Sequence, residues 1–295
     1  MQTSLNTSKW YDRPWAAFIF FTRLPFWRLH QPPRQCYESV VEWWPLTGWL
    51  TGGVMAAILY FGPQLSIVND PLDLWSLATK GTQEWSMVNG QWSIIVLLAI
   101  IARILLTGAL HEDGLADFFD GFGGGGTDRQ RILAIMKDSH IGTYGVLGLI
   151  LYVALLFLCL NSIPPLLAAM TVLVADPYAK MLGAQMTQMM PYARNEETSK
   201  AHTVYRRMSL LSGILLAVQG LLPLAICIWL NYQFSIINCQ LSWQWLLFTP
   251  CLVMYFLYLF VWRRLRGYTG DCCGAFFLLI ELSIYLVMAL QSYSA

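Results

Sequence analysis

Residues 208–262 decide the fold class. They read MSLLSGILLAVQGLLPLAICIWLNYQFSIINCQLSWQWLLFTPCLVMYFLYLFVW, 55 residues without Asp, Glu, Lys, Arg or His. A membrane-spanning helix needs about 20 mainly apolar residues, each adding about 1.5 Å across a hydrocarbon core of about 30 Å. This segment is therefore long enough for two spans. Residues 143–175 form a second charge-free segment, and the same argument places two more spans from residue 143 onward.

The whole chain shares this apolar bias. Of its 295 residues, 57% are apolar and 12% are charged, whereas soluble domains have about 45–50% and about 25%. The composition excludes a disordered chain, a basic nucleic-acid binder and a soluble enzyme, so we expect a lipid bilayer around the protein and no nucleic acid partner. It predicts an all-α, polytopic membrane protein, with one domain over residues 1–295 and seven spans near residues 43–62, 92–110, 143–162, 165–186, 209–230, 244–262 and 272–290.

The basic residues predict the orientation of the spans, because cytoplasmic loops are enriched in Lys and Arg. Of the 18 Lys and Arg residues, 15 fall on the side of the N-terminus. Lys80 falls on the opposite side, and Arg103 and Lys180 fall within spans. We therefore expect a cytoplasmic N-terminus and a C-terminus on the opposite side. In the polar segment 1–40, the apolar run at residues 15–21 predicts a helix lying on the inner membrane surface.

An acidic segment follows the second predicted span, where residues 111–122 read HEDGLADFFDGF. On a helix, Asp113, Asp117 and Asp120 lie at positions i, i+4 and i+7, on one face. Carboxylates at this spacing repel one another, and oxygen ligands suit Mg²⁺ or Mn²⁺ rather than zinc. Mg²⁺ completes its shell with water and substrate phosphates. The pattern predicts a Mg²⁺ site at these three residues and a diphosphate substrate. The alternative, a solvated helix end, fits less well beside three phenylalanines and a membrane span.

Other polar residues near this segment have open roles. His111 lies about 200° around the helix from Asp113, and this position favours a structural hydrogen-bonding group over a catalytic base. Arg131, Lys137, Asp138 and His140 follow. Cations beside a metal cluster suit a substrate with more negative charge than the metal neutralises, and Lys137 is the main phosphate candidate. The alternative is that these cations only set the topology.

Charged residues within or beside the later spans are also candidates. Asp176 and Lys180 lie four residues apart inside the fourth span, where ionisable groups are costly and are either functional or paired with each other. Asp271 opens the seventh span on the same side as Asp113, and Glu281 falls inside that span. A second acid near the first acidic cluster would help to close a metal or substrate site.

Several motifs together resemble a known family. They are FTRLP at residues 21–25, HEDGLADFFDG at 111–121, IMKDSHIGTYG at 135–145, PYAR at 191–194 and GYTGD at 267–271. The chain is similar to the cobalamin synthase family of adenosylcobinamide-GDP ribazoletransferases over nearly its whole length. The resemblance implies a Mg²⁺-dependent, multi-pass enzyme of the bacterial inner membrane, with its active site on the cytoplasmic side. Such an enzyme joins adenosylcobinamide-GDP to α-ribazole, or to its 5′-phosphate, and releases GMP.

The resemblance also implies roles for individual residues. Asp113, Asp117 and Asp120 match the family's aspartate motif and would hold Mg²⁺. The catalytic candidates are Asp120, which would also take the hydroxyl proton, Lys137, which would steady the diphosphate, and His111. The candidates for substrate binding are Arg23, Arg131, Asp138, His140, Thr269 and Asp271. Two positions depart from the family pattern, since Glu112 stands where an apolar residue is common and Cys273 where a leucine is common.

Two other functions remain open at this point. A different Mg²⁺-dependent intramembrane transferase, such as a prenyltransferase or a CDP-alcohol phosphotransferase, also places spaced aspartates at a membrane face. The segment DGLADF at residues 113–118, however, lacks the arginine of the DGxxAR element. A transporter would explain seven spans and the charged pair Asp176 and Lys180, but it predicts inverted repeats and a site at the membrane midplane. The sequence also leaves a homo-oligomer open.

Overall fold

The computed structural model describes residues 9–65, 89–194, 205–234 and 243–293. These residues form helices joined by short connections, and one isolated bridge pairs Tyr192 with Tyr268. In chain order the elements are α1 (Asp12–Phe21), η1 (Phe26–Arg28), η2 (Arg34–Trp43), α2 (Trp44–Phe61), η3 (Gly62–Leu65), α4 (Asn89–Thr107), α5 (Leu110–Gly124), α6 (Arg129–Lys137), α7 (Thr143–Ser162), α8 (Pro165–Ala184), α9 (Met186–Met189), α10 (Leu210–Phe234), α11 (Trp243–Leu265) and α12 (Gly270–Tyr293).

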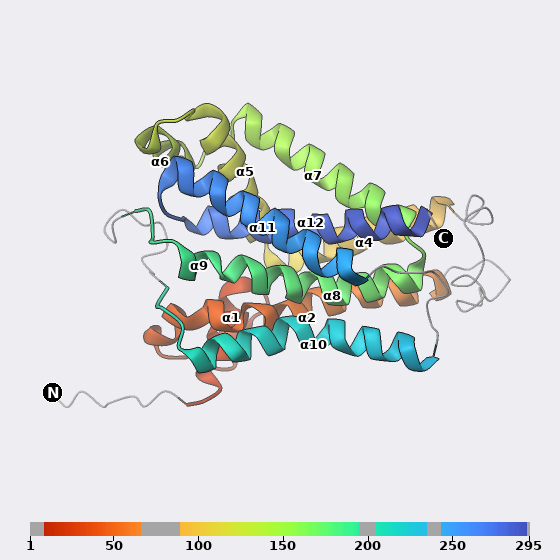
Figure 1. Cartoon of the computed structure of the whole chain (residues 1–295). Coiled ribbons are helices and arrows are strands. Elements are labelled where there is room, and N and C mark those ends of the chain that lie inside the picture. The colour runs from red at the N-terminus through yellow and green to blue at the C-terminus, as the bar shows by residue number, and fades with distance from the viewer. Residues whose placement is uncertain (1–8, 66–88, 195–204, 235–242, 294–295) are drawn as a thin grey trace.

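Seven of the described helices are long and apolar enough to cross a membrane. They are α2, α4, α7, α8, α10, α11 and α12, which confirms the all-α polytopic class and the seven predicted spans. Lys80, the basic residue predicted on the side opposite the N-terminus, lies outside the described residues, as does Lys200. In Figure 1 these seven helices run side by side, with α1 at one end of the bundle and the last residues of α12 at the other.

The second span ends earlier than predicted, at Thr107 rather than near residue 110. Gly108 and Ala109 have φ angles of 64° and 57°. This left-handed region suits glycine and is unfavourable for an alanine, whose Cβ crowds the backbone there. The helix therefore stops at this pair, and α5 begins as a separate helix at Leu110.

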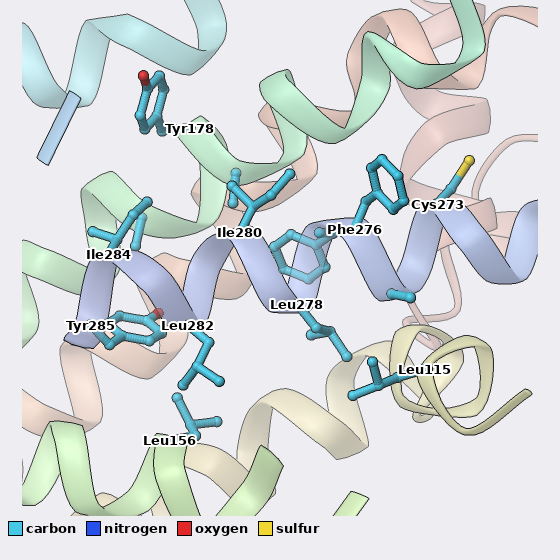
Figure 2. Close-up of a cluster of buried hydrophobic side chains, with 14 of the residues drawn as sticks. Leu115, Leu156, Tyr178, Cys273, Phe276, Leu278, Ile280, Leu282, Ile284 and Tyr285 are labelled. Carbon is cyan, nitrogen blue, oxygen red and sulfur yellow. The ribbon is translucent and has the colours of Figure 1, made fainter. Parts of the chain in front are cut away.

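Helices α8 and α12 form the centre of the bundle. In each of them 78% of the membrane-spanning window is buried, against 44% or less in the other five. Figure 2 shows how α12 reaches its neighbours, with Ile280 on the side of α8, Leu282 facing Leu156 of α7, and Leu278 facing Leu115 of α5. Lipid tails are as apolar as these side chains, so close packing rather than removal from water holds such helices together.

Glycines allow close contact in two pairs of helices, α2 with α8 and α5 with α12. A Cβ on Gly52 of α2 would lie 3.1 Å from the carbonyl oxygen of Val172 in α8. A Cβ on Gly114 of α5 would lie 3.1 Å from the Cα of Asp271, and one on Gly274 of α12 would lie 3.1 Å from the carbonyl oxygen of His111. Small residues of this kind let membrane helices approach each other through their backbones. The start of α12 is therefore held directly against the acidic helix α5.

The charged side chains inside the bundle are paired. Lys180 Nζ lies 2.6 Å from Asp176 Oδ1 and donates to the Thr51 hydroxyl, so the predicted pairing within the fourth span is confirmed. Arg103 Nη1 lies 2.6 Å from Glu281 Oε2. Glu281 is fully buried and bound to this arginine, so Asp271 remains the candidate for the second acid near the acidic cluster.

Candidate functional site

The acidic segment forms helix α5, which confirms the helical spacing of its three aspartates. Helices α5 and α6 and the start of α12 lie at the same end of the bundle as α1 (Figure 1). Along α5, Asp113 is exposed, Asp117 is half-buried and Asp120 is buried. The three carboxylates therefore share a helix but differ in their access to a ligand.

Asp120 holds the beginning of α7. One of its carboxylate oxygens accepts a hydrogen bond from the Gly142 amide at 2.7 Å, and the other accepts one from the Gly145 amide at 2.8 Å. A Cβ on either glycine would collide with the Asp120 carboxylate, which explains why both positions lack a side chain. The first amides of a helix have no partner within the helix, and Asp120 supplies one from α5. This role differs from the predicted roles of metal ligand and proton acceptor.

Helix α6 carries the predicted phosphate-binding cations. Its N-cap is Asp128, which accepts from the amides of Gln130 and Arg131, and Lys137 is its last residue. The side chains of Arg131 and Lys137 are exposed. The buried Met136 packs against Gly121 of α5 and lies with its sulfur 3.9 Å from the Thr269 hydroxyl. Helix α6 is thus packed between α5 and the start of α12.

Thr269 and Asp271 lie at the first turn of α12. Thr269 is fully buried, and its hydroxyl oxygen accepts from the Cys272 amide at 3.3 Å, so it caps the helix rather than facing a ligand. Asp271 is partly exposed and lies with Oδ2 3.7 Å from Nη2 of Arg194. Because the Cα of Asp271 lies close to Gly114, the structure brings Asp271 beside the α5 face that carries Asp113. This agrees with the expected second acid near the cluster.

Arg194 is a site candidate to which the sequence assigned no role. Its side chain is 5% exposed, and its Nη2 donates to the Leu133 carbonyl at 3.4 Å. Its Nε has no hydrogen-bond partner among the described residues. A buried guanidinium with an unpaired donor is costly and suits binding of an anion. The motif PYAR was a signal for this residue, but its contact with Asp271 depends on how distant segments pack.

His111 is placed in the interior of the protein and away from the exposed aspartates. It is 3% exposed, and its ring is stacked with those of Phe21 and Trp44 at centroid distances of 6.2 and 5.8 Å. Burial lowers the pKa of His111 well below its usual value, and the positive charges of Lys180 and Arg103 lower it further. The geometry therefore does not favour a catalytic role for His111. The predicted structural hydrogen bond is not seen among the described residues either, because Nε2 is buried without a partner, and the ring is held by aromatic packing instead.

Two other predicted substrate-binding groups lie in the connection from α6 to α7. Nδ1 of His140 is 2.6 Å from Oδ1 of Asp138, and the backbone amide of His140 donates to the same oxygen at 3.1 Å. The hydrogen bond between these side chains raises the pKa of His140 and lowers that of Asp138. The side chains are 89% and 57% exposed, respectively, so both are open to a substrate.

Arg23 lies apart from these two groups, at the break between α4 and α5. Its amide donates to the Leu106 carbonyl at 2.7 Å, and its side chain passes over Gly108, which has no room for a Cβ. The predicted site residues therefore lie around α5. Arg23 is next to Gly108, just before that helix, the α6 cations lie along its C-terminal half, and Asp271 lies against Gly114.

The aspartates of α5 meet the requirements of Mg²⁺ only in part. Within the described residues, no group of three or more His, Cys, Asp and Glu side chains is arranged to hold a metal ion, and Asp120 already accepts two amide hydrogen bonds. Protein-bound Mg²⁺ is usually held by one or two carboxylates, with water and substrate phosphates completing its octahedral shell. Asp113 and Asp117, one turn apart on α5, meet this smaller requirement.

Comparison with known proteins identifies the family of this chain. A family model described as cobalamin-5-phosphate synthase matches residues 13–289. Curated proteins named adenosylcobinamide-GDP ribazoletransferase are similar over most of their length. That of Vibrio cholerae serotype O1 is 32% identical over 280 residues, covering 92% of this chain and 91% of the relative. Those of Leptospira interrogans and Shewanella baltica are each 30% identical, covering 94% and 92% of both chains.

No solved structure matches the chain. The matched names describe a transferase of cobalamin synthesis, in agreement with the sequence motifs, and give no support to a transporter or to a prenyltransferase. From the extent of these matches, the chain belongs to the cobalamin-5-phosphate synthase family.

Proposed function

We propose that this protein joins adenosylcobinamide-GDP to α-ribazole, or to α-ribazole 5′-phosphate, and releases GMP. The observation that carries the proposal is the family match over residues 13–289. In this reaction the ribose hydroxyl attacks the phosphorus on the cobinamide side of the diphosphate, and GMP leaves. Such a step requires neutralisation of the negative charge on the transferred phosphoryl group and on the leaving group.

Asp113 and Asp117 are the residues that we propose would hold Mg²⁺, and a bound Mg²⁺ would supply neutralisation of the negative charge on the diphosphate. The exposure of Asp113 and the partial exposure of Asp117 support this assignment. The backbone of Asp271 lies against Gly114 of the same helix, and its carboxylate lies 3.7 Å from Arg194. We do not include Asp120 among the ligands, because both of its oxygens bind the start of α7.

Exposed cations next to this acidic face would bind the rest of the substrate charge. Lys137 and Arg131 of α6 are exposed, and α6 packs on the C-terminal half of α5. Arg194 offers an unpaired Nε close to Asp271. These groups suit the diphosphate and the nucleotide that leaves, because cations placed beside phosphate oxygens form charge-assisted hydrogen bonds.

The site would face the cytoplasm at the inner membrane of a bacterium. The support is the concentration of Lys and Arg on the N-terminal side of the predicted spans, together with the position of α5 and α6 at the same end of the bundle as α1 (Figure 1). Soluble substrates would reach the aspartates from that compartment without crossing the bilayer.

The activity is tested with purified protein in nanodiscs, supplied with adenosylcobinamide-GDP, α-ribazole and Mg²⁺. We expect GMP and a cobalamin product in equal amounts, and loss of both when a chelator removes Mg²⁺. The variant Asp117→Asn should lose this release while keeping its elution volume and thermal unfolding temperature. Folded wild-type protein that forms no GMP would refute the activity, and wild-type rates in Asp117→Asn would refute the metal assignment.

A further inference from the structure

The connection between α6 and α7 holds an imidazole and a carboxylate in direct contact. His140 Nδ1 lies 2.6 Å from Asp138 Oδ1. With Asp138 ionised, this distance fits an Nδ1–H group that donates to the carboxylate, which leaves the lone pair on Nε2 of a neutral imidazole. A carboxylate that fixes the tautomer of a histidine in this way prepares the other ring nitrogen to accept a proton.

This connection is fixed to the acidic helix. Asp120 of α5 binds the amides of Gly142 and Gly145, so the anchor begins two residues after His140. Neither glycine position has room for a Cβ beside the Asp120 carboxylate. Because Asp113 and Asp117 lie on the same helix as Asp120, the anchor ties the histidine connection to the helix that carries the proposed metal ligands.

The other candidates for a proton acceptor are less suitable. Among the described residues the histidines are His30, His111 and His140. His111 is buried among aromatic rings, and Nε2 of His30 binds Asp12, at 2.6 Å, in the N-terminal segment. Asp120 uses both oxygens as acceptors for backbone amides. His140 combines an exposed ring with a carboxylate partner.

We propose that His140 is the general base of the reaction and that Asp138 is its positioning residue. The inference rests on the proposed function. As the ribose hydroxyl attacks, its O–H bond breaks and the proton moves to His140 Nε2. A bond forms between the hydroxyl oxygen and the phosphorus on the cobinamide side, and the bond from that phosphorus to the oxygen of GMP breaks. GMP leaves with the electron pair, and His140 then releases the proton to solvent.

The proposal predicts the direction of a pH dependence. A general base acts in its neutral form, so kcat/KM rises with pH through the pKa of His140. The hydrogen bond with Asp138 raises this pKa above its usual value. The charged groups around the connection are Asp138 and Lys137 on its own side and Asp120 from α5. Removing the Asp138 charge should therefore move the rising limb of the profile to lower pH.

The experiment measures GMP release from about pH 5 to pH 9 by wild-type protein in nanodiscs, and by His140→Gln, His140→Gly and Asp138→Asn. General-base catalysis contributes about 10² to 10⁴ in rate, so we expect the rate of GMP release by His140→Gln to fall by that factor. Its pH profile should also lose the rise in kcat/KM that is assigned to His140. In Asp138→Asn this rise should remain but occur at lower pH. Added imidazole should restore part of the rate to His140→Gly, because the position is open to solvent.

The matched control is His30→Gln, which breaks a similar contact with an aspartate at 2.6 Å in the N-terminal segment. It should keep the wild-type rate and profile. If the wild-type protein forms no GMP, both the activity and the role of His140 are refuted. If the wild-type protein is active but His140→Gln keeps its rate and limb, or imidazole fails to restore folded His140→Gly, only the role of His140 is refuted.

Discussion

At the scale of single residues, Asp113 and Asp120 show that equal spacing on a helix does not imply equal roles. Both lie on α5, but Asp113 is exposed while Asp120 is 7% exposed and binds two amides of α7. A carboxylate that satisfies the free amides at a helix start stabilises the fold. An exposed carboxylate is available to a metal ion and its substrate.

The two variants Asp113→Asn and Asp120→Asn should therefore fail in different ways. We expect Asp113→Asn to lower GMP release by more than about 10², the lower limit for a lost general base, with little change in stability. Asp120→Asn should lower the free energy of unfolding by about 0.5–2 kcal/mol, as for a lost helix cap. Steady-state kinetics and thermal unfolding in detergent measure the two effects. A normal rate in Asp113→Asn would contradict the ligand assignment.

At the scale of elements, the junction of α5 with α7 depends on missing side chains. Gly145 lies where a Cβ would overlap Asp120 and come within 3.0 Å of the Ala116 carbonyl oxygen. The Asp120 carboxylate is tied to the backbone at two points, so it cannot move aside without losing a hydrogen bond. The contact between the helices therefore has little tolerance for added volume.

Gly145→Ala should lower the free energy of unfolding by about 1–3 kcal/mol, the usual effect of overpacking. The matched control is Gly53→Ala in α2, where a Cβ would meet nothing within 4 Å. That change should leave stability equal or raise it by up to about 1 kcal/mol, because alanine favours a helix over glycine. Thermal unfolding of both variants checks the difference, and equal melting temperatures would show that the junction adapts.

At the scale of the whole molecule, a buried ionic contact joins helices far apart in the sequence. Arg103 of α4 binds Glu281 of α12, and its Nη2 donates to the Tyr152 hydroxyl of α7 at 2.8 Å. Tyr285 donates to Glu281 at 2.7 Å. These contacts connect three spans inside the bundle, where an unpaired charge has no water to solvate it.

Glu281→Gln should lower the free energy of unfolding by up to about 3–5 kcal/mol, because it removes the closest counterion of the buried Arg103 and leaves only Glu112, whose Oε1 lies 4.0 Å from Nη2. The double variant Arg103→Met with Glu281→Leu replaces this ion pair by an apolar pair of similar size and should recover part of that loss. Recovery is incomplete because Glu112 loses the arginine as its partner. Thermal unfolding in one detergent compares the three proteins. A double variant less stable than Glu281→Gln would contradict this account.

The sequence predicted the spans well and their contacts poorly, and the difference has a physical cause. A span is set by its own length and hydropathy, because the bilayer acts on each segment separately. The partner of Glu281 is 178 residues away along the chain, and the role of Asp120 depends on glycines that follow in a different helix. The spacing of the aspartates predicted that they share a helix. Which of them is exposed to a ligand depends on how α5 packs against other helices, and the spacing carries no information on that packing.

The anchor between Asp120 and the two glycines has a consequence for how this family can change over time. Because the carboxylate fills the space that a Cβ would need at Gly142 or Gly145, a side chain at either glycine position is compatible only with a smaller residue in place of Asp120. We therefore expect these three positions to vary together. A chain without the aspartate would lose the restriction to glycine, and the start of α7 would need another cap.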